Sequence, residues 1–215
     1  MKRFGVLVAA LLLGLSASNA QAKFSYGDIA AGRFAQKSVW GLRSMNDGAH
    51  YTTLEDGVVC RYNYEGDQER VELCNTREID LGGRVADYTF SPDERKIMFR
   101  LDSKPLYRRS HFSKYVVYDL EQKRLTDVDE SSEVRYAMFS PAGDKVAYVK
   151  DNNLFVRNLS GGECVRVTED GEWNHIINGM PDWVYEEEWG IDHAFCWSPD
   201  GNHIAFLKSD ESEVE

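Results

Sequence analysis

Short apolar stretches separated by polar turns run through most of this chain. Residues 114–120, 154–159 and 165–168 are rich in β-branched and aromatic side chains, which favour strands. Glycine, asparagine and aspartate, which suit tight turns, lie between such stretches. Helical periodicity is almost absent, so the pattern predicts an all-β fold.

A turn followed by an apolar strand recurs along the chain. Clear copies cover residues 90–99, 139–148 and 197–206, and a weaker copy covers residues 43–51. In the clearest copy, Ser-Pro-Asp-Gly at 198–201 provides the proline and glycine that tight turns favour. The serines at positions 44, 91, 140 and 198 mark the copies, which are 47, 49 and 58 residues apart.

A period of about 50 residues built from several short strands is typical of β-propeller blades. An ordinary β-sandwich with chance similarity among its turns is the alternative. The last copy has only its first strand before the end, so the repeats predict three to four blades. That number cannot close a ring, and open sheet edges lower stability. We therefore expect residues 23–215 to form an incomplete propeller, the amino-terminal part of a larger protein.

The first 22 residues have the pattern of a signal peptide. Lys2 and Arg3 precede an apolar run at 6–15, and Ala-Gln-Ala at 20–22 provides a small-x-small cleavage site. A buried amino-terminal strand or helix is the alternative for this segment. The pattern predicts export to the periplasm or the extracellular space. No later stretch is long and apolar enough to predict a membrane-spanning helix.

The charge of the chain excludes some partners. The formal net charge is −11, and removal of Lys2 and Arg3 with the signal peptide takes it to −13. Nucleic-acid binding requires clustered Lys and Arg, so neither DNA nor RNA is an expected partner. The five histidines show no metal-ligand spacing, and no metal or cofactor is expected.

The four cysteines do not form a CxxC pair, which argues against a zinc site. Cys60 and Cys74 flank a predicted hairpin that turns near Gly66, and an oxidising compartment would permit a disulfide between them. Buried free thiols are the alternative.

An acidic run between aromatic residues, at 182–189, is the strongest candidate for a binding site. Three successive carboxylates, Glu186 to Glu188, lie between large aromatic side chains. These side chains predict a partly desolvated wall in which opposite charge is worth more than in water, which favours a compact ammonium ligand. A solvated acidic face is the alternative. Adjacent acids diverge on a strand, so we expect a short helical turn or irregular loop here, with Asp182 as a turn or cap residue.

This run, Asp-Trp-Val-Tyr-Glu-Glu-Glu at 182–188, together with Trp-Ser-Pro-Asp-Gly at 197–201, resembles the dipeptidyl peptidase IV family. Tyr-Arg-Arg-Ser at 107–110 and Asp-Asn-Asn-Leu at 151–154 add to the resemblance. It implies an eight-bladed propeller joined to an α/β-hydrolase domain, in an enzyme that removes dipeptides with Pro or Ala at the second position. It also implies that family members commonly form homodimers.

By the same resemblance, Glu187 and Glu188 bind the free amino terminus of a peptide substrate, and Glu186 is not expected to touch it. Arg108 holds a backbone carbonyl of the substrate, although the match could shift by one to Arg109. Paired carboxylates make charge-assisted hydrogen bonds to an ammonium group, which positions the peptide for cleavage.

The sequence contains no Gly-x-Ser-x-Gly, so no catalytic serine, aspartate or histidine can be assigned in it. We expect this chain alone to be inactive. A non-enzymatic periplasmic propeller that serves as a binding or scaffold module is the alternative function. A Gly-x-Ser-x-Gly motif downstream in the reading frame would favour the peptidase, whereas a stop codon after the last blade would favour the scaffold.

Overall fold

The computed structural model describes residues 24–36, 41–66, 69–131, 134–161 and 163–214. The chain divides into two units, residues 1–40 and 41–215. In the first unit, helix α2 (Tyr26–Ala30) begins at a capping box in which Ser25 and Asp28 bond each other's backbone N–H. The predicted signal peptide lies outside the described residues. None of the helices described is long and apolar enough to cross a membrane.

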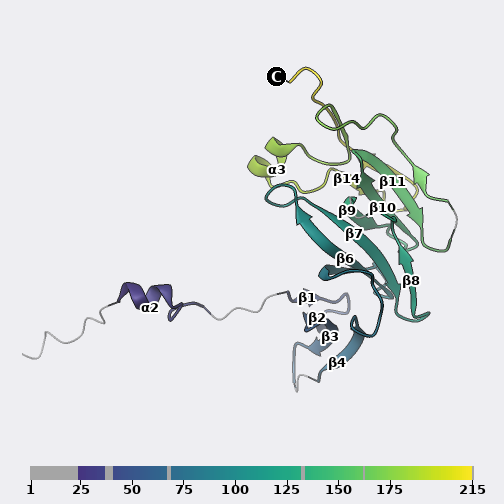
Figure 1. The fold of residues 1–215 in the computed structure, drawn as a ribbon. Helices are drawn as coiled ribbons and strands as arrows, with labels where there is room; N and C mark the ends of the chain where they lie inside the picture. The colour runs from purple at the N-terminus through teal and green to yellow at the C-terminus, as the bar shows by residue number, and fades with distance from the viewer. Residues whose placement is uncertain (1–23, 37–40, 67–68, 132–133, 162, 215) are drawn as a thin grey trace, which may run out of the picture. The chain divides into compact units, whose positions relative to one another are not determined.

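The second unit is a series of four-stranded antiparallel meanders (Figure 1). The first blade consists of β1 (Arg43–Ser44), β2 (His50–Glu55), β3 (Val58–Asn63) and β4 (Val71–Asn75), each paired with the next. Sequential pairing of this kind is what short, turn-linked strands predict.

The next two blades form one continuous sheet. The second consists of β5 (Val85–Phe90), β6 (Lys96–Pro105), β7 (His111–Asp119) and β8 (Arg124–Asp127). The third consists of β9 (Val134–Phe139), β10 (Lys145–Lys150), β11 (Asn153–Asn158) and β12 (Val165–Arg166). A single pairing, Ser113 with Val134, joins β7 to β9.

The remaining segment begins a further blade and contains the acidic run. β13 (Ile176–Asn178) pairs with β16 (Lys208–Asp210), and β14 (Phe195–Trp197) pairs with β15 (Ile204–Phe206). Helix α3 (Trp183–Trp189) lies between β13 and β14. The last repeat therefore contributes one strand beyond the one expected, because β16 follows β15 after its turn.

The same turn opens each repeat. In the three Ser-Pro copies, the serine N–H donates to the carbonyl five residues later at 2.8 to 2.9 Å. In the first copy this hydrogen bond runs from Met45 to His50 at 2.9 Å, so Met45 is the counterpart of the later serines. The assignment of Ser44 as the mark is wrong by one residue, which makes the first spacing 46.

The hydrophobic core lies in three clusters between successive blades. One joins β3 and β4 to β5, β6 and β7; the second joins β6 and β7 to β9 and β10; the third joins β10 and β11 to β13 and β14. On β10, Val146 and Tyr148 face the second cluster, while Ala147 and Val149 face the third. Alternate side chains of a central strand thus fill the cores on both of its faces. This face-to-face stacking of meanders confirms the partial propeller.

Of the two alternatives for Cys60 and Cys74, the structure has buried free thiols and no disulfide. The hairpin of β3 and β4 forms as predicted, although part of its turn, at 67–68, lies outside the described residues. A bulge sets Cys74 opposite Val59 and Cys60 opposite Glu72, so the two thiols lie on opposite faces of the sheet. Both are buried and free, and burial raises the pKa of Cys74 to about 11.

Candidate functional site

Helix α3 presents the acidic run as one short, capped turn, as the sequence predicts. Asp182 is its N-cap, and its Oδ1 accepts a hydrogen bond from the N–H of Tyr185 at 2.8 Å. Gly190 ends the helix in the left-handed conformation, with φ of 71°, and its N–H donates to the carbonyl of Glu186. The caps fix which way the three glutamates between them point.

The three glutamates differ sharply in their surroundings. Successive residues of a helix are turned by about 100°, so three in a row cover more than half its circumference. Glu186 is fully buried, the side chain of Glu187 is 15% exposed, and Glu188 is exposed. Glu187 and Glu188 are therefore the glutamates of α3 that solvent can reach, whereas Glu186 lies inside.

Arg108 lies beside these acids on a separate element. Strands β6 and β7 are the longest of the second blade, and their hairpin ends in residues 106–110, here named the Arg108 loop. The loop closes when the N–H of Leu106 donates to the carbonyl of Ser110 at 2.9 Å. The Nε of Arg108 lies 2.9 Å from Oε2 of Glu187. The structure thus brings Arg108 and Glu187 together from positions 79 residues apart, with Glu188 on the same helix.

The expected wall of desolvating aromatic side chains is wrong. Trp183, Tyr185 and Trp189 are 54%, 43% and 71% exposed, and the Tyr185 and Trp189 rings contact each other at 5.6 Å. Tyr185 and Trp189 are four residues apart and share one exposed face of α3, while Trp183, at its first position, is exposed separately. The desolvated carboxylate is that of Glu186.

Sequence reasoning missed the buried groups beneath the site. Oε1 of Glu186 accepts hydrogen bonds from the N–H groups of Arg109 and Ser110, and the guanidinium of Arg135 on β9 lies nearby. Burial lowers the pKa of Arg135, and Glu186 partly opposes that shift. The sequence signal for these buried groups was Arg135, the one charged residue in the otherwise apolar stretch 134–139. A charge buried in such a strand requires a hydrogen-bonded or charged partner.

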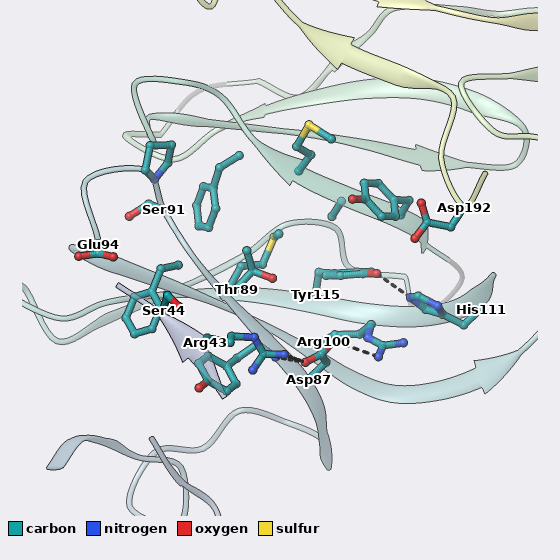
Figure 2. Close-up of a pocket in the computed structure, with 18 of the residues that line it drawn as sticks. Arg43, Ser44, Asp87, Thr89, Ser91, Glu94, Arg100, His111, Tyr115 and Asp192 are labelled. Atoms are coloured by element: carbon teal, nitrogen blue, oxygen red, sulfur yellow. Dashed lines mark hydrogen bonds and ion pairs between the residues drawn. The ribbon is translucent and has the colours of Figure 1, made fainter. Parts of the chain in front are cut away.

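A cavity of about 690 Å³ is lined by residues of β1, β5, β6, β7 and β9 and by Arg109 of the Arg108 loop (Figure 2). Arg43 and Arg100 both contact Asp87 on its floor, and Nε2 of His111 lies 2.9 Å from the hydroxyl of Tyr115. Burial, with the charge of Arg100, lowers the pKa of His111, so its imidazole is neutral at pH 7. Three arginines and three carboxylates line this cavity, so its charges balance: Arg43, Arg100 and Arg109 with Asp87, Glu94 and Asp192.

No group of three or more His, Cys, Asp or Glu residues in the described part of the chain could hold a metal ion. The carboxylates and the guanidinium at α3 can form charge-assisted hydrogen bonds. The Arg108–Glu187 pair is solvent-facing on the arginine side, which is 73% exposed. Exposed ion pairs contribute at most about 1 kcal/mol, so a ligand ammonium can compete for Glu187.

Comparison with known proteins identifies the class to which this fold and site belong. Over residues 91–215, more than half of the chain, the sequence matches the family described as the dipeptidyl peptidase IV (DPP IV) N-terminal region. The chain belongs to this family, and the predicted resemblance is confirmed.

Among individual relatives, dipeptidyl aminopeptidase B of Saccharomyces cerevisiae is 37% identical over 80% of this chain and 21% of its own length. Prolyl endopeptidase FAP of Mus musculus is 30% identical over 91% of this chain and 26% of its own length. The crystal structure of Porphyromonas gingivalis dipeptidyl peptidase 4 matches with a TM-score of 0.79 and 34% identity, over 91% of this chain and 29% of that one. The chain thus spans between a fifth and a third of these relatives.

The glycine that ends α3 provides a test of how tightly the helix meets the Arg108 loop. An added Cβ at Gly190 would lie 3.4 Å from the Arg109 guanidinium, and φ of 71° disfavours any L side chain. We expect Gly190→Ala to lower the free energy of unfolding by about 1 to 2 kcal/mol in urea titrations. Gly48→Ala is the matched control, because φ is 69° but nothing lies within 4 Å of the added atom. An equal loss of unfolding free energy in both variants would show that the Arg109 side chain moves away from the added Cβ without lowering stability.

Proposed function

We propose that this chain is the propeller part of an exported serine dipeptidyl peptidase, and that it binds the free amino terminus of peptide substrates. Glu187 and Glu188 receive the ammonium group, and Arg108 binds a backbone carbonyl next to it. The observation that carries the proposal is the convergence of Arg108 and Glu187, at 2.9 Å, beside the exposed Glu188.

The geometry supports this assignment on chemical grounds. An ammonium group has three N–H donors, and two carboxylates can accept from it while neutralising its charge. The planar guanidinium of Arg108 suits a carbonyl oxygen better than a lysine would. A peptide held by its amino terminus can extend only a fixed number of residues from the anchor, which supports the release of dipeptides.

The same proposal assigns catalysis to residues outside these 215. It takes Pro or Ala as the second substrate residue and requires no cofactor, both from the family resemblance. Export to the periplasm or extracellular space rests on the pattern of residues 1–22, and homodimerisation rests on the resemblance alone.

Direct binding tests the proposal. Trp183 and Trp189 flank the glutamates and are exposed, so tryptophan fluorescence of the 215-residue chain can follow a titration with the tripeptide Ala-Pro-Ala. We expect saturable binding of the free peptide and at least tenfold weaker binding of its N-acetyl form, since acetylation removes the positive charge. Equal affinity for both peptides would contradict the amino-terminus site.

A second expectation concerns activity. The 215-residue chain should release no p-nitroaniline from Gly-Pro-p-nitroanilide, because no Gly-x-Ser-x-Gly nucleophile occurs in it. The assay compares the chain with buffer alone and, as positive control, with a dipeptidyl peptidase 4. Turnover that follows the chain through purification and is abolished by a serine-directed inhibitor would overturn the assignment of catalysis to other residues.

A further inference from the structure

Glu186 is the one carboxylate of the acidic run that cannot touch a ligand. It is fully buried, on the face of α3 turned toward the Arg108 loop. Burying a carboxylate is costly unless it is hydrogen-bonded or paired with a charge. A glutamate at this position therefore requires an explanation other than contact with substrate.

The partners of Glu186 supply that explanation. Its Oε1 accepts hydrogen bonds from the backbone N–H of Arg109 at 2.6 Å and of Ser110 at 2.8 Å. Both donors directly follow Arg108 in the chain. Because the bonds go to main-chain atoms, they fix the path of the Arg108 loop whatever side chains it carries.

A buried cation lies against the same carboxylate. Arg135 on β9 is only 3% exposed, and its Nη1 donates to Oδ1 of Asn152 at 3.2 Å. Oε2 of Glu186 and Nε of Arg135 are both buried and have no hydrogen-bond partner in the described part of the chain. The guanidinium of Arg135 interacts electrostatically with the Glu186 carboxylate, so the loop bonds of Glu186 are made beside a buried opposite charge.

We propose that Glu186 is a positioning residue, which holds the Arg108 loop against α3 so that Arg108, Glu187 and Glu188 can contact one peptide amino terminus together. This inference rests on the proposed function of that site. The three groups belong to two elements. Among the described residues, the hydrogen bonds and ion pairs that join these elements are the Glu186 bonds and the exposed Arg108–Glu187 pair. The buried bonds are the stronger of the two connections.

The test uses two variants of the 215-residue chain and the Ala-Pro-Ala titration. Glu186→Ala removes both loop bonds, and we expect it to weaken peptide affinity about tenfold. A change of this size matches the coupling energies measured between residues in contact. Glu186→Gln keeps an oxygen acceptor but loses the charge, so a smaller loss of about threefold is expected. This conservative variant keeps the test valid should Glu186→Ala fail to fold.

A double-mutant cycle separates positioning from general stability. If Glu186 acts through Arg108, the loss from Glu186→Gln should shrink to less than twofold in an Arg108→Ala background. Amide hydrogen exchange at Arg109 and Ser110 should also accelerate in the Glu186 variants, while exchange in β10 stays unchanged. Glu169→Gln, at an exposed glutamate after β12, is the control for loss of one charge.

The outcomes distinguish this inference from the proposed function. Unchanged peptide affinity in both Glu186 variants, or the same loss with and without Arg108, would overturn the positioning role. If the unaltered chain binds free and acetylated peptide equally, the proposed function fails. Faster exchange at Arg109 and Ser110 in the variants would then still establish that Glu186 holds the loop.

Discussion

Replacing Glu187 and Glu188 together by Gln is expected to abolish the preference for a free amino terminus. Glutamine keeps the size and the oxygen acceptors of both side chains but removes two negative charges. Hydrogen bonds to charged groups contribute about 1.5 to 3 kcal/mol each, so affinity for Ala-Pro-Ala should fall about a hundredfold or more. The N-acetyl peptide should be little affected, since it carries no ammonium group.

The control for this variant must change charge without touching α3. Glu121 on the β7–β8 turn and Glu169 after β12 are both exposed, so Glu121→Gln with Glu169→Gln removes the same two charges. Because the chain has a net charge of −11, long-range attraction of any cation would weaken in both double variants. An equal loss of affinity in the two would show that the acids act as a diffuse field rather than as a site.

The single variants should differ, because the two acids differ in their surroundings. Glu187 already pairs with Arg108, whereas Glu188 makes no hydrogen bond or ion pair with the described residues. Glu187→Gln therefore loses one ligand contact and also releases Arg108, while Glu188→Gln loses a contact alone. We expect the larger loss of affinity from Glu187→Gln.

The blades and their turns could be predicted from the sequence because their signals are local. A proline, an aspartate and a glycine at fixed offsets specify the turn, and alternation specifies the strand that follows. A local signal also predicted the turn at α3, since Asp182, expected as a turn or cap residue, is its N-cap. The first repeat was misaligned because Met45 replaces the serine there, and only the hydrogen bond to His50 sets the register.

What the sequence left open or predicted wrongly depends on features that no local pattern contains. Whether Cys60 and Cys74 could pair depended on strand register, which sets Cys74 opposite Val59 and leaves the two thiols on opposite faces of the sheet. The desolvation of the acidic run depended on which side of α3 meets the Arg108 loop. Composition around the glutamates could not show this, because Glu186 finds its partners 76 and 77 residues earlier in the chain.

Asn152 is the position at which a single substitution should most weaken the fold beneath the site. It occupies the tight turn between β10 and β11 with φ of 55°, after Asp151 with φ of 49°. Two successive left-handed residues define the turn that suits a two-residue hairpin, and asparagine tolerates this conformation better than most residues. Although it lies in a turn, Asn152 is only 3% exposed.

Asn152 joins three segments through its buried side chain and its backbone carbonyl. Its Oδ1 accepts from Nη1 of Arg135 at 3.2 Å, and its Nδ2 donates to the carbonyl of Glu172 at 3.0 Å. Its own carbonyl accepts from the N–H of Asn178 at 3.0 Å. The turn of the third blade is thereby fixed to β9 and to the segment that leads into α3.

We expect Asn152→Ala to lower the free energy of unfolding by about 3 kcal/mol, measured as a shift of the urea midpoint. Left-handed backbone costs alanine about 1 kcal/mol, and each buried group left without a partner costs about 1 to 3 kcal/mol more. An unchanged midpoint would show that water replaces the asparagine at no cost.

Two further variants divide this loss between its causes. Asn152→Gly also removes the side chain but accepts the left-handed conformation, so it should be more stable than Asn152→Ala by about 1 kcal/mol. Asn152→Asp keeps the acceptor for Arg135 but sets a carboxylate oxygen against the carbonyl of Glu172 in place of the amide donor. The charge of Arg135 offsets part of that repulsion, so Asn152→Asp should be more stable than Asn152→Ala. If Asn152→Asp were as unstable as Asn152→Ala, the bond to Arg135 would contribute nothing. Arg135 would then be held at Glu186 by the carboxylate charge alone.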